Sequence, residues 1–203
     1  VLKLERPTAD STYIPMELKI TRGTIRTNPV PYYGMVDKNI GYIAISTFAI
    51  EGCSKDIKKA LIELKQQGAT SIVLDLRGNG GGLLSEAVNV VNFFVPKGKE
   101  IVVTKGKIKQ AGSTYKTSNE PIDMEIPLTV LVDGATASAA EIVSGSLQDL
   151  DRAVIVGNRT YGKGLVQVPR ELPYNSSMKV TTAKYYIPSG RCIQALSLIH
   201  ISE

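Results

Sequence analysis

Ser138 lies in a run of small residues, Gly134 to Ala140, between a predicted strand and a predicted helix. A serine in the first turn of a helix is close to the positive end of the helix dipole, which favours a developing oxyanion there. The small neighbours would leave room for a bulky substrate. Taken alone, however, the segment fits a serine that caps the helix somewhat better than a nucleophile.

A serine nucleophile needs a base, and the chain offers a lysine rather than a histidine. His200 is the single histidine and stands three residues from the C-terminus. Lys163 lies between Gly162 and Gly164, surroundings that could desolvate an amine and favour the neutral form that a lysine general base requires. Gln167, four residues further on, alternates to a position from which it could orient that amine.

Two glycine-rich segments lie where phosphate-binding loops occur in other proteins. Gly78 to Gly82 follows a predicted strand, but Leu83 stands where the dinucleotide motif needs its last glycine. Its glycines could free backbone N–H groups for an anion or an oxyanion, or form only a tight turn. The spacing from Gly157 to Lys163 approaches a P-loop, but Gly164 replaces the Ser or Thr that binds magnesium. Nucleotide hydrolysis is therefore not expected.

The composition of the 203-residue chain narrows the class of protein. An apolar fraction of 43% with 21% charged residues is normal for a globular protein. The net charge of +5 comes from scattered lysines, so nucleic acid is not an expected partner. One histidine with Cys53 and Cys192 cannot build a zinc site of the usual kinds, and no metal or other cofactor is predicted. Whether the two cysteines are thiols or a disulfide stays open.

The apolar pattern predicts strands that alternate with helices, which is typical of an α/β fold. Ser54 is predicted to cap the first helix, Gly68 to end it and Pro96 to stop the second. Residues 165–186 alternate like an antiparallel or edge system, and 104–125 indicate a hairpin or an excursion. Strands are expected over 40–45, 71–76, 128–132 and 153–156, the last three of the buried type, and helices over 55–67, 84–95 and 137–149.

The two ends of the chain differ from its middle. Residues 1–27 contain two predicted strands, 1–6 and 16–22, which are too few for a domain. We therefore expect them to belong to a module that begins upstream of Val1. Pro29 and Pro31 mark a linker after these strands.

Five stretches together resemble the C-terminal processing peptidases, also called tail-specific proteases, which are serine peptidases with a Ser-Lys dyad. They occur in the order of that family within residues 17–194. The stretches are Asn39–Ile43, Leu74–Gly82, Gly134–Glu141, Tyr161–Gln167 and Ala183–Arg191.

The resemblance implies a role for each candidate residue. Ser138 resembles the nucleophile, Lys163 its general base and Gln167 the residue that holds the lysine. The backbone amides of Gly82 and Ala139 resemble the oxyanion hole.

The resemblance also implies a fold and domain boundaries. The expected fold is an α/β peptidase core, related to the Clp protease and crotonase folds, over residues 28–194. Residues 1–27 resemble the C-terminal strands of a truncated PDZ domain, a module that recognises substrate C-termini in this family. Its usual carboxylate-binding loop is absent here. Residues 195–203 match no family motif and form an atypical tail.

The function that this implies is a serine endopeptidase that cleaves proteins near their C-termini through an acyl-enzyme. Expected partners are protein or peptide substrates with apolar C-termini, and any membrane association would come from a segment upstream of Val1. The family is usually periplasmic or otherwise exported. Two alternatives are a non-catalytic domain that binds an apolar ligand or peptide on the same fold, and an acyl-CoA enzyme of crotonase type. The second alternative would leave Ser138, Lys163 and Gln167 unexplained.

Overall fold

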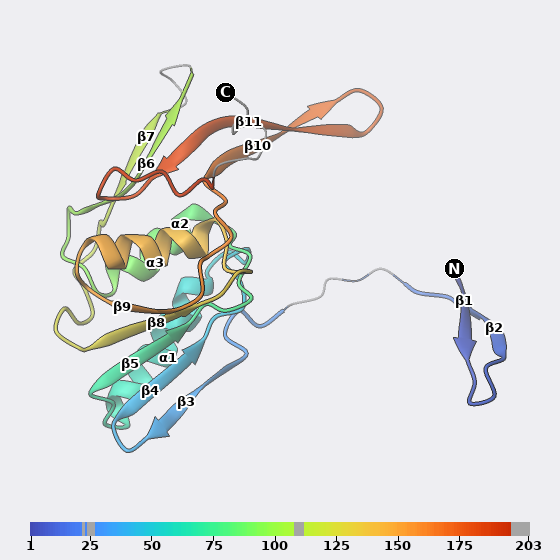
Figure 1. Cartoon of the computed structure of the whole chain (residues 1–203), viewed down its shortest axis with the longest axis horizontal. Helices are drawn as coiled ribbons and strands as arrows, with labels where there is room; N and C mark the ends of the chain where they lie inside the picture. Colours follow the sequence, from blue (N-terminus) through green and yellow to red (C-terminus); the bar gives the residue numbers. More distant parts are fainter. Residues whose placement is uncertain (22, 24–26, 108–111, 196–203) are drawn as a thin grey trace.

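The computed structural model describes residues 1–21, 23, 27–107 and 112–195. Its centre is a five-stranded sheet in the order β3-β4-β5-β8-β9 (Figure 1). The strands from β4 to β9 run parallel, whereas β3 is an antiparallel edge. Their bounds are Tyr32–Asp37 (β3), Ile40–Ala44 (β4), Ser71–Asp75 (β5), Leu128–Val132 (β8) and Val154–Gly157 (β9).

One face of this sheet is covered by helices, which in the described part of the chain are α1 (Cys53–Gln66), α2 (Leu84–Asn92) and α3 (Ala139–Asp149). Side chains on that face, such as Ile43, Leu74 and Val130, are fully buried. Each such burial stabilises the fold by about 1.5–3 kcal/mol, so the core lies here. No helix in the described ranges is long and apolar enough to span a bilayer.

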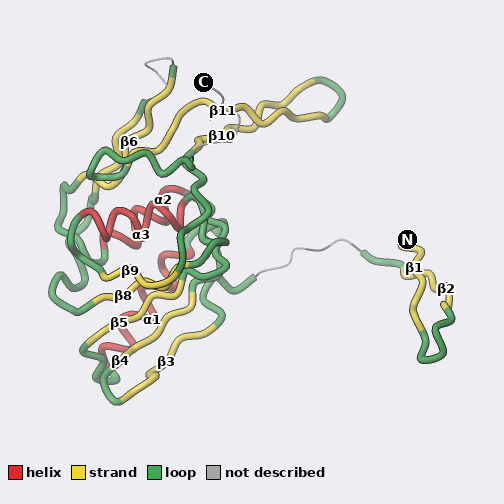
Figure 2. The backbone as a smooth tube through the Cα atoms, viewed as in Figure 1, coloured by secondary structure: helices red, strands yellow, loops and turns green. Residues whose placement is uncertain are grey.

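A second sheet lies on the other side of α2 and α3, so these helices are sandwiched between two sheets (Figure 2). The hydroxyl of Ser146 in α3 donates to the carbonyl oxygen of Ile101 at 3.0 Å, which joins the helix to this sheet. The predicted α/β class is confirmed. The strand order is β10-β11-β6-β7, with bounds Leu165–Leu172 (β10), Ser176–Tyr186 (β11), Glu100–Gly106 (β6) and Ser113–Lys116 (β7).

The parallel strand order brings three loops to one edge of the central sheet. We call them the glycine loop (residues 76–83, after β5), the serine loop (133–138, after β8) and the lysine loop (158–164, after β9). Because β5, β8 and β9 are neighbours, the loops at their carboxyl ends lie side by side. The sheet thus gathers the candidate residues of three distant stretches.

The N-terminal strands form a separate hairpin of β1 (Leu2–Pro7) and β2 (Tyr13–Leu18). Every residue of β1 is exposed. The second strand was predicted at 16–22, but it begins earlier because the backbone N–H of Thr8 bonds to the carbonyl oxygen of Thr12 at 2.9 Å and closes the turn there. The predicted linker around Pro29 lies between this hairpin and β3.

The predicted cap of the first helix is wrong. α1 begins at Cys53, and its N-cap residue is Gly52, which has a φ of 83°. The buried carboxylate of Glu86 in α2 accepts the N–H groups of Gly52 at 2.9 Å and of Ser54 at 2.8 Å. Ser54 is not needed as a cap, since a carboxylate from another helix satisfies the free amides. Gly68 ends the helix as predicted, with a φ of 96°.

The last strand of the central sheet was predicted to be buried, which is also wrong. β9 is an edge strand, and Val154 and Val156 are 65% and 47% exposed. Their position at the edge of the sheet, and not their apolar character, decides their exposure.

Two further helix bounds, the end of α2 and the start of α3, differ from the predicted ones. α2 ends at Asn92, whose side chain donates to the carbonyl oxygen of Asn119 at 2.7 Å and so ties the helix end to a distant loop. α3 begins at Ala139, because the backbone of Ser138 is not helical.

One strand was not recognised from the sequence, and another was placed too late in the chain. β3 was missed because Gly34 interrupts its apolar alternation. The hairpin expected within 104–125 is present, but its first strand, β6, starts earlier at Glu100.

Candidate active site

Ser138 occupies a strained turn between β8 and α3. Its φ of 56° and ψ of −117° lie in a region that glycine adopts readily and other residues rarely do. Such strain costs about 1–3 kcal/mol and persists only where the surroundings enforce it. The side chain is half-buried at the first turn of α3.

The serine loop is held in this shape by Asp133 and Thr136. The Asp133 carboxylate accepts the N–H of Ala135 at 2.9 Å and that of Gly78 in the glycine loop at 3.0 Å. The bond from Gly78, helped by those from Ala135 and Thr136 and opposed by partial burial, holds the pKa of Asp133 below its usual value. The Thr136 hydroxyl donates to the carbonyl oxygen of Leu76 at 2.8 Å. The serine loop and the glycine loop are therefore fastened together.

Asn79 is the central residue of this fastening and is fully buried. Its side-chain amide donates to the carbonyl oxygen of Ile45 at 2.8 Å and accepts the N–H of Gly81 at 2.9 Å. Its backbone carbonyl oxygen accepts the N–H of Ala137 at 2.9 Å. One asparagine thus joins the segment after β4, the glycine loop and the serine loop, a role that sequence reasoning missed.

Gly81 packs directly against the nucleophile candidate. A Cβ atom on Gly81 would lie 2.9 Å from Cβ of Ser138 and 2.8 Å from the backbone nitrogen of Ala139. A Cβ atom on Gly82 would lie 2.1 Å from backbone atoms of Phe48 and Ala49. No side chain fits at either position, so the glycines allow the loop to approach Ser138 this closely.

The amides of Gly82 and Ala139 have no hydrogen-bond acceptor among the described residues. The N–H of Ala139 is at the N-terminus of α3, where the helix dipole is positive. Free N–H groups of this kind beside a serine can stabilise an oxyanion. This is chemistry that the two loops make available.

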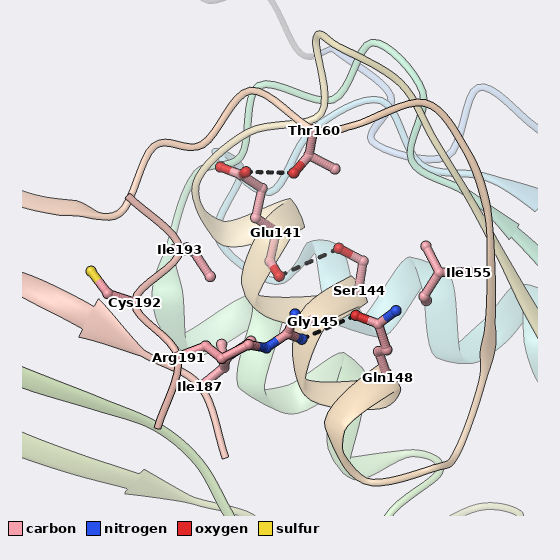
Figure 3. Close-up of a pocket in the computed structure, with 10 residues that line it drawn as sticks. All are labelled: Glu141, Ser144, Gly145, Gln148, Ile155, Thr160, Ile187, Arg191, Cys192 and Ile193. Carbon is pink, nitrogen blue, oxygen red and sulfur yellow. Dashed lines mark hydrogen bonds between the residues drawn. The ribbon is translucent and has the colours of Figure 1, made fainter. Parts of the chain in front are cut away.

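Glu141 connects Ser138 with Lys163. One oxygen of its buried carboxylate, Oε2, accepts the backbone N–H of Ser138 at 2.7 Å and that of Lys163 at 2.8 Å. The other oxygen accepts the hydroxyl of Thr160 at 2.7 Å (Figure 3). It also accepts the N–H of Gly162 at 2.6 Å. Sequence reasoning missed this role, although the spacing Ser-x-x-Glu is the signature of a capping box.

The bonds to Glu141 involve the backbones of Ser138 and Lys163, and not the side chains of the candidates Ser138, Lys163 and Gln167. No hydrogen bond links the Ser138 side chain to Nζ of Lys163, both of which belong to the described part. Lys163 is half-buried in the lysine loop. Gln167 is exposed on β10, and its backbone pairs with Thr181 next to a β-bulge. Gln167 is therefore near the lysine loop along the chain, but among the described residues its side chain makes no hydrogen bond to that loop.

A cavity of about 200 Å³ lies between α3 and the segment 187–193, which follows β11 (Figure 3). Glu141 and Thr160 contribute to its wall, together with Gly145, Ile187 and Arg191. Neither Ser138 nor Lys163 lines it. Among the described residues, no cluster of three or more His, Cys, Asp or Glu could hold a metal ion.

Comparison with known proteins places these features in a family. The chain is 38% identical over 190 residues to a carboxy-terminal-processing protease of Bartonella bacilliformis, which covers 91% of this chain and 42% of that protein. It is 40% identical over 185 residues to a carboxyl-terminal-processing protease of Picosynechococcus sp., and the match covers 90% of this chain and 44% of that protein. The chain thus spans less than half the length of these curated relatives.

The fold has a similar counterpart among solved structures. The photosystem II D1 C-terminal processing protease superposes with a TM-score of 0.74 and 33% sequence identity, over 95% of this chain and 53% of that one. Residues 39–199 match the sequence pattern of Peptidase family S41, and this range includes the glycine, serine and lysine loops. The chain described here therefore belongs to Peptidase family S41.

Proposed function

We propose that this chain is the catalytic core of a serine endopeptidase with Ser138 as nucleophile and Lys163 as general base. The observation that carries the proposal is the shared oxygen of Glu141, which ties the backbones of both residues to one point. A nucleophile and its base must be held in a fixed relation for proton transfer between them.

The reaction follows the usual acyl-transfer order. The neutral amine of Lys163 takes the proton of the Ser138 hydroxyl as the oxygen attacks a peptide carbonyl. The amides of Gly82 and Ala139 donate to the resulting oxyanion. The lysine ammonium then gives its proton to the leaving amine, and water attacks the acyl-enzyme by the same route in reverse, with Lys163 again as the base.

A serine-directed fluorophosphonate tests the assignment without a known substrate. We expect the reagent to modify Ser138, identified by mass spectrometry of the 203-residue chain. Ser138→Ala should abolish the labelling, and Lys163→Ala should slow it by at least about 100-fold. Ser118→Ala, an exposed serine outside the three loops, is the matched control. A rate that Ser138→Ala leaves unchanged would overturn the proposal.

Gln167 is proposed to orient the amine of Lys163. The β-bulge between Val166 and Gln167 supports this, since bulges re-aim side chains next to active sites. We expect Gln167→Ala to slow Ser138 labelling by about 10-fold, and Gln167→Glu to retain more of the rate because it keeps an acceptor. Equal rates in all three proteins would remove Gln167 from the site.

The substrates are proposed to be proteins that are cut near apolar C-termini. The relatives named as carboxy-terminal-processing proteases support cleavage near a C-terminus; the apolar character of that terminus is the part that the experiment decides. The test compares peptides that differ only in an apolar or a charged C-terminal residue, digested by the longest natural protein that contains this chain. Preference for the charged peptide would contradict the proposal.

Residues 1–27 are proposed to be part of a PDZ domain. The hairpin supports this, because its register places five apolar side chains on one face, namely Leu2, Leu4, Ile14, Met16 and Leu18. Amide exchange in the hairpin, compared between this chain and the longest natural protein that contains it, tests the proposal.

The protein is proposed to work outside the cytoplasm. A relative named as chloroplastic supports this location. Cell fractionation of the source organism tests it.

A further inference from the structure

The backbone on both sides of Lys163 is bound by Gln194 and Ala195, which follow the second sheet. The side-chain oxygen of Gln194 accepts the N–H of Gly164 at 2.9 Å. The N–H of Ala195 donates to the carbonyl oxygen of Gly162 at 2.9 Å. These two bonds hold the residues before and after the lysine, and we call Gln194 and Ala195 the lysine clamp.

The clamp approaches as closely as it does because both neighbours of Lys163 are glycines. A Cβ atom on Gly164 would lie 2.3 Å from the backbone nitrogen of Gln194. A Cβ atom on Gly162, whose φ is 83°, would lie 2.5 Å from Cβ of Ala195. The flanking glycines therefore serve the contact with the clamp and are more than flexible spacers.

The orientation of the Gln194 side chain is set by a second bond. Its Nε2 donates to the carbonyl oxygen of Ala195 at 3.0 Å, so the amide oxygen faces Gly164. The carbonyl oxygen of Gly164 in turn accepts the N–H of Tyr185 in β11 at 2.8 Å. Gly164 is thus bound at both its N–H and its C=O.

Three parts of the chain therefore bind the lysine loop, namely α3, β11 and the lysine clamp. Glu141 in α3 binds the N–H groups of Gly162 and Lys163 on one side. β11 and the lysine clamp bind Gly162 and Gly164 on the other. A side chain as long as lysine reaches a defined point only when its own backbone is held in this way.

We propose that Gln194 is a positioning residue that sets the place of the Lys163 amine relative to Ser138. The inference rests on the proposed roles of Ser138 and Lys163. Gln194 touches no substrate; it acts through the peptide of Gly164. Loss of its amide leaves the N–H of Gly164 without a partner in a half-buried loop and frees the lysine loop to move.

The test uses two substitutions that separate the hydrogen bond from the volume of the side chain. Gln194→Met keeps the length of the side chain and removes both bonds, whereas Gln194→Glu keeps an acceptor for Gly164. The readout is the rate constant of Ser138 labelling by a fluorophosphonate in the 203-residue chain. Gln66→Met, the same change at an exposed position on α1, is the matched control.

We expect Gln194→Met to slow labelling by about 10- to 100-fold, because the lysine loop no longer holds the amine of Lys163 at one point. Gln194→Glu should recover most of the rate. A purely structural defect would lower the fraction of protein that can be labelled, without changing the rate constant of the remainder. An unchanged rate constant in Gln194→Met would overturn the inference while leaving the proposed function intact.

Labelling of the wild-type chain separates the two levels of the proposal. If the wild-type chain does not react, the proposed function fails, and the clamp is tested by amide hydrogen exchange at Gly164 instead. Exchange there should accelerate in Gln194→Met and stay unchanged in Gln66→Met. Equal exchange in the three proteins would overturn the clamp as well.

Discussion

Ser138 and Lys163 donate their backbone N–H groups to the same oxygen atom of Glu141, although they come from loops that follow different strands. The distance between the two residues is therefore set by a buried carboxylate and not by the flexible lysine side chain.

Glu141→Gln should weaken both the fold and the site. An amide presents one oxygen and one NH₂ group, so the donors that now face the second carboxylate oxygen would meet another donor. Each unsatisfied donor costs about 1–3 kcal/mol, and we expect the free energy of unfolding to fall by about 2–4 kcal/mol in urea titrations. Labelling of Ser138 should slow at least 10-fold. Glu120→Gln, at an exposed position, should change neither quantity, and equal stability of Glu141→Gln and wild type would refute the role of the carboxylate.

Gly81→Ala and Gly80→Ala form a matched pair in the glycine loop. The new Cβ atom in Gly81→Ala would lie 2.6 Å from the carbonyl oxygen of Ala137 and 2.9 Å from Cβ of Ser138, on a backbone with a φ of 90°. The same atom in Gly80→Ala meets nothing within 4 Å. We expect Gly81→Ala to slow Ser138 labelling by about 100-fold and Gly80→Ala to leave it within about twofold. The close approach would be disproved by similar rates in the two variants.

The backbone strain at Ser138 can be measured as stability. Both Ser138→Ala and Ser138→Gly remove the hydroxyl, but only glycine relaxes at a φ of 56° and a ψ of −117°. Relief of strain outweighs the extra freedom that glycine has in the unfolded chain, so Ser138→Gly should be more stable than Ser138→Ala by about 1 kcal/mol. Thermal and urea unfolding of the two variants measure the difference, and a more stable Ser138→Ala would show that the turn is unstrained.

Asp133 makes the junction of the serine and glycine loops sensitive to acid. In the folded state the hydrogen bonds from Gly78, Ala135 and Thr136 hold the pKa of Asp133 below its usual value of 3.8. The ionised carboxylate therefore stabilises the fold at pH values above 3.8. This contribution is lost as the pH falls through the lower pKa of the folded state. Wild type should lose more stability than Asp133→Asn between about pH 6 and pH 3 in urea titrations. Parallel losses in the two proteins would contradict the shift.

The two cysteines should differ in reactivity. Both are free thiols, Cys53 buried and Cys192 exposed. Burial, reinforced by the nearby carboxylate of Glu86, raises the pKa of Cys53 to about 12, and the thiolate is the reactive form. At about pH 8 an alkylating reagent should modify Cys192 alone, and both thiols only in urea. Mass spectrometry identifies the modified residues. Modification of Cys53 in the folded chain would show that the contact between the start of α1 and Glu86 of α2 opens.

The sequence alone determined the elements with strong local patterns. β5, β8, α1 and α3 follow from apolar periodicity, because residues that must face one core repeat at the period of a strand or a helix. The glycines before α2 and the small residues before α3 predicted the loops around Gly82 and Ser138, since turns of this kind need little or no side chain. The state of Cys53 and Cys192, free or bridged, leaves no such local signal in the sequence.

Tertiary structure decided which groups meet. Glu86 replaces Ser54 as the cap of α1, β9 is an exposed edge, and Glu141 binds residues of two loops. Each of these depends on segments that are distant in the chain and become neighbours only through the strand order. Local periodicity records which face of an element is buried, but a hydrogen bond between distant loops depends on the packing of the whole sheet. The sequence therefore predicted the candidates Ser138 and Lys163, and only the fold places their backbones on one carboxylate.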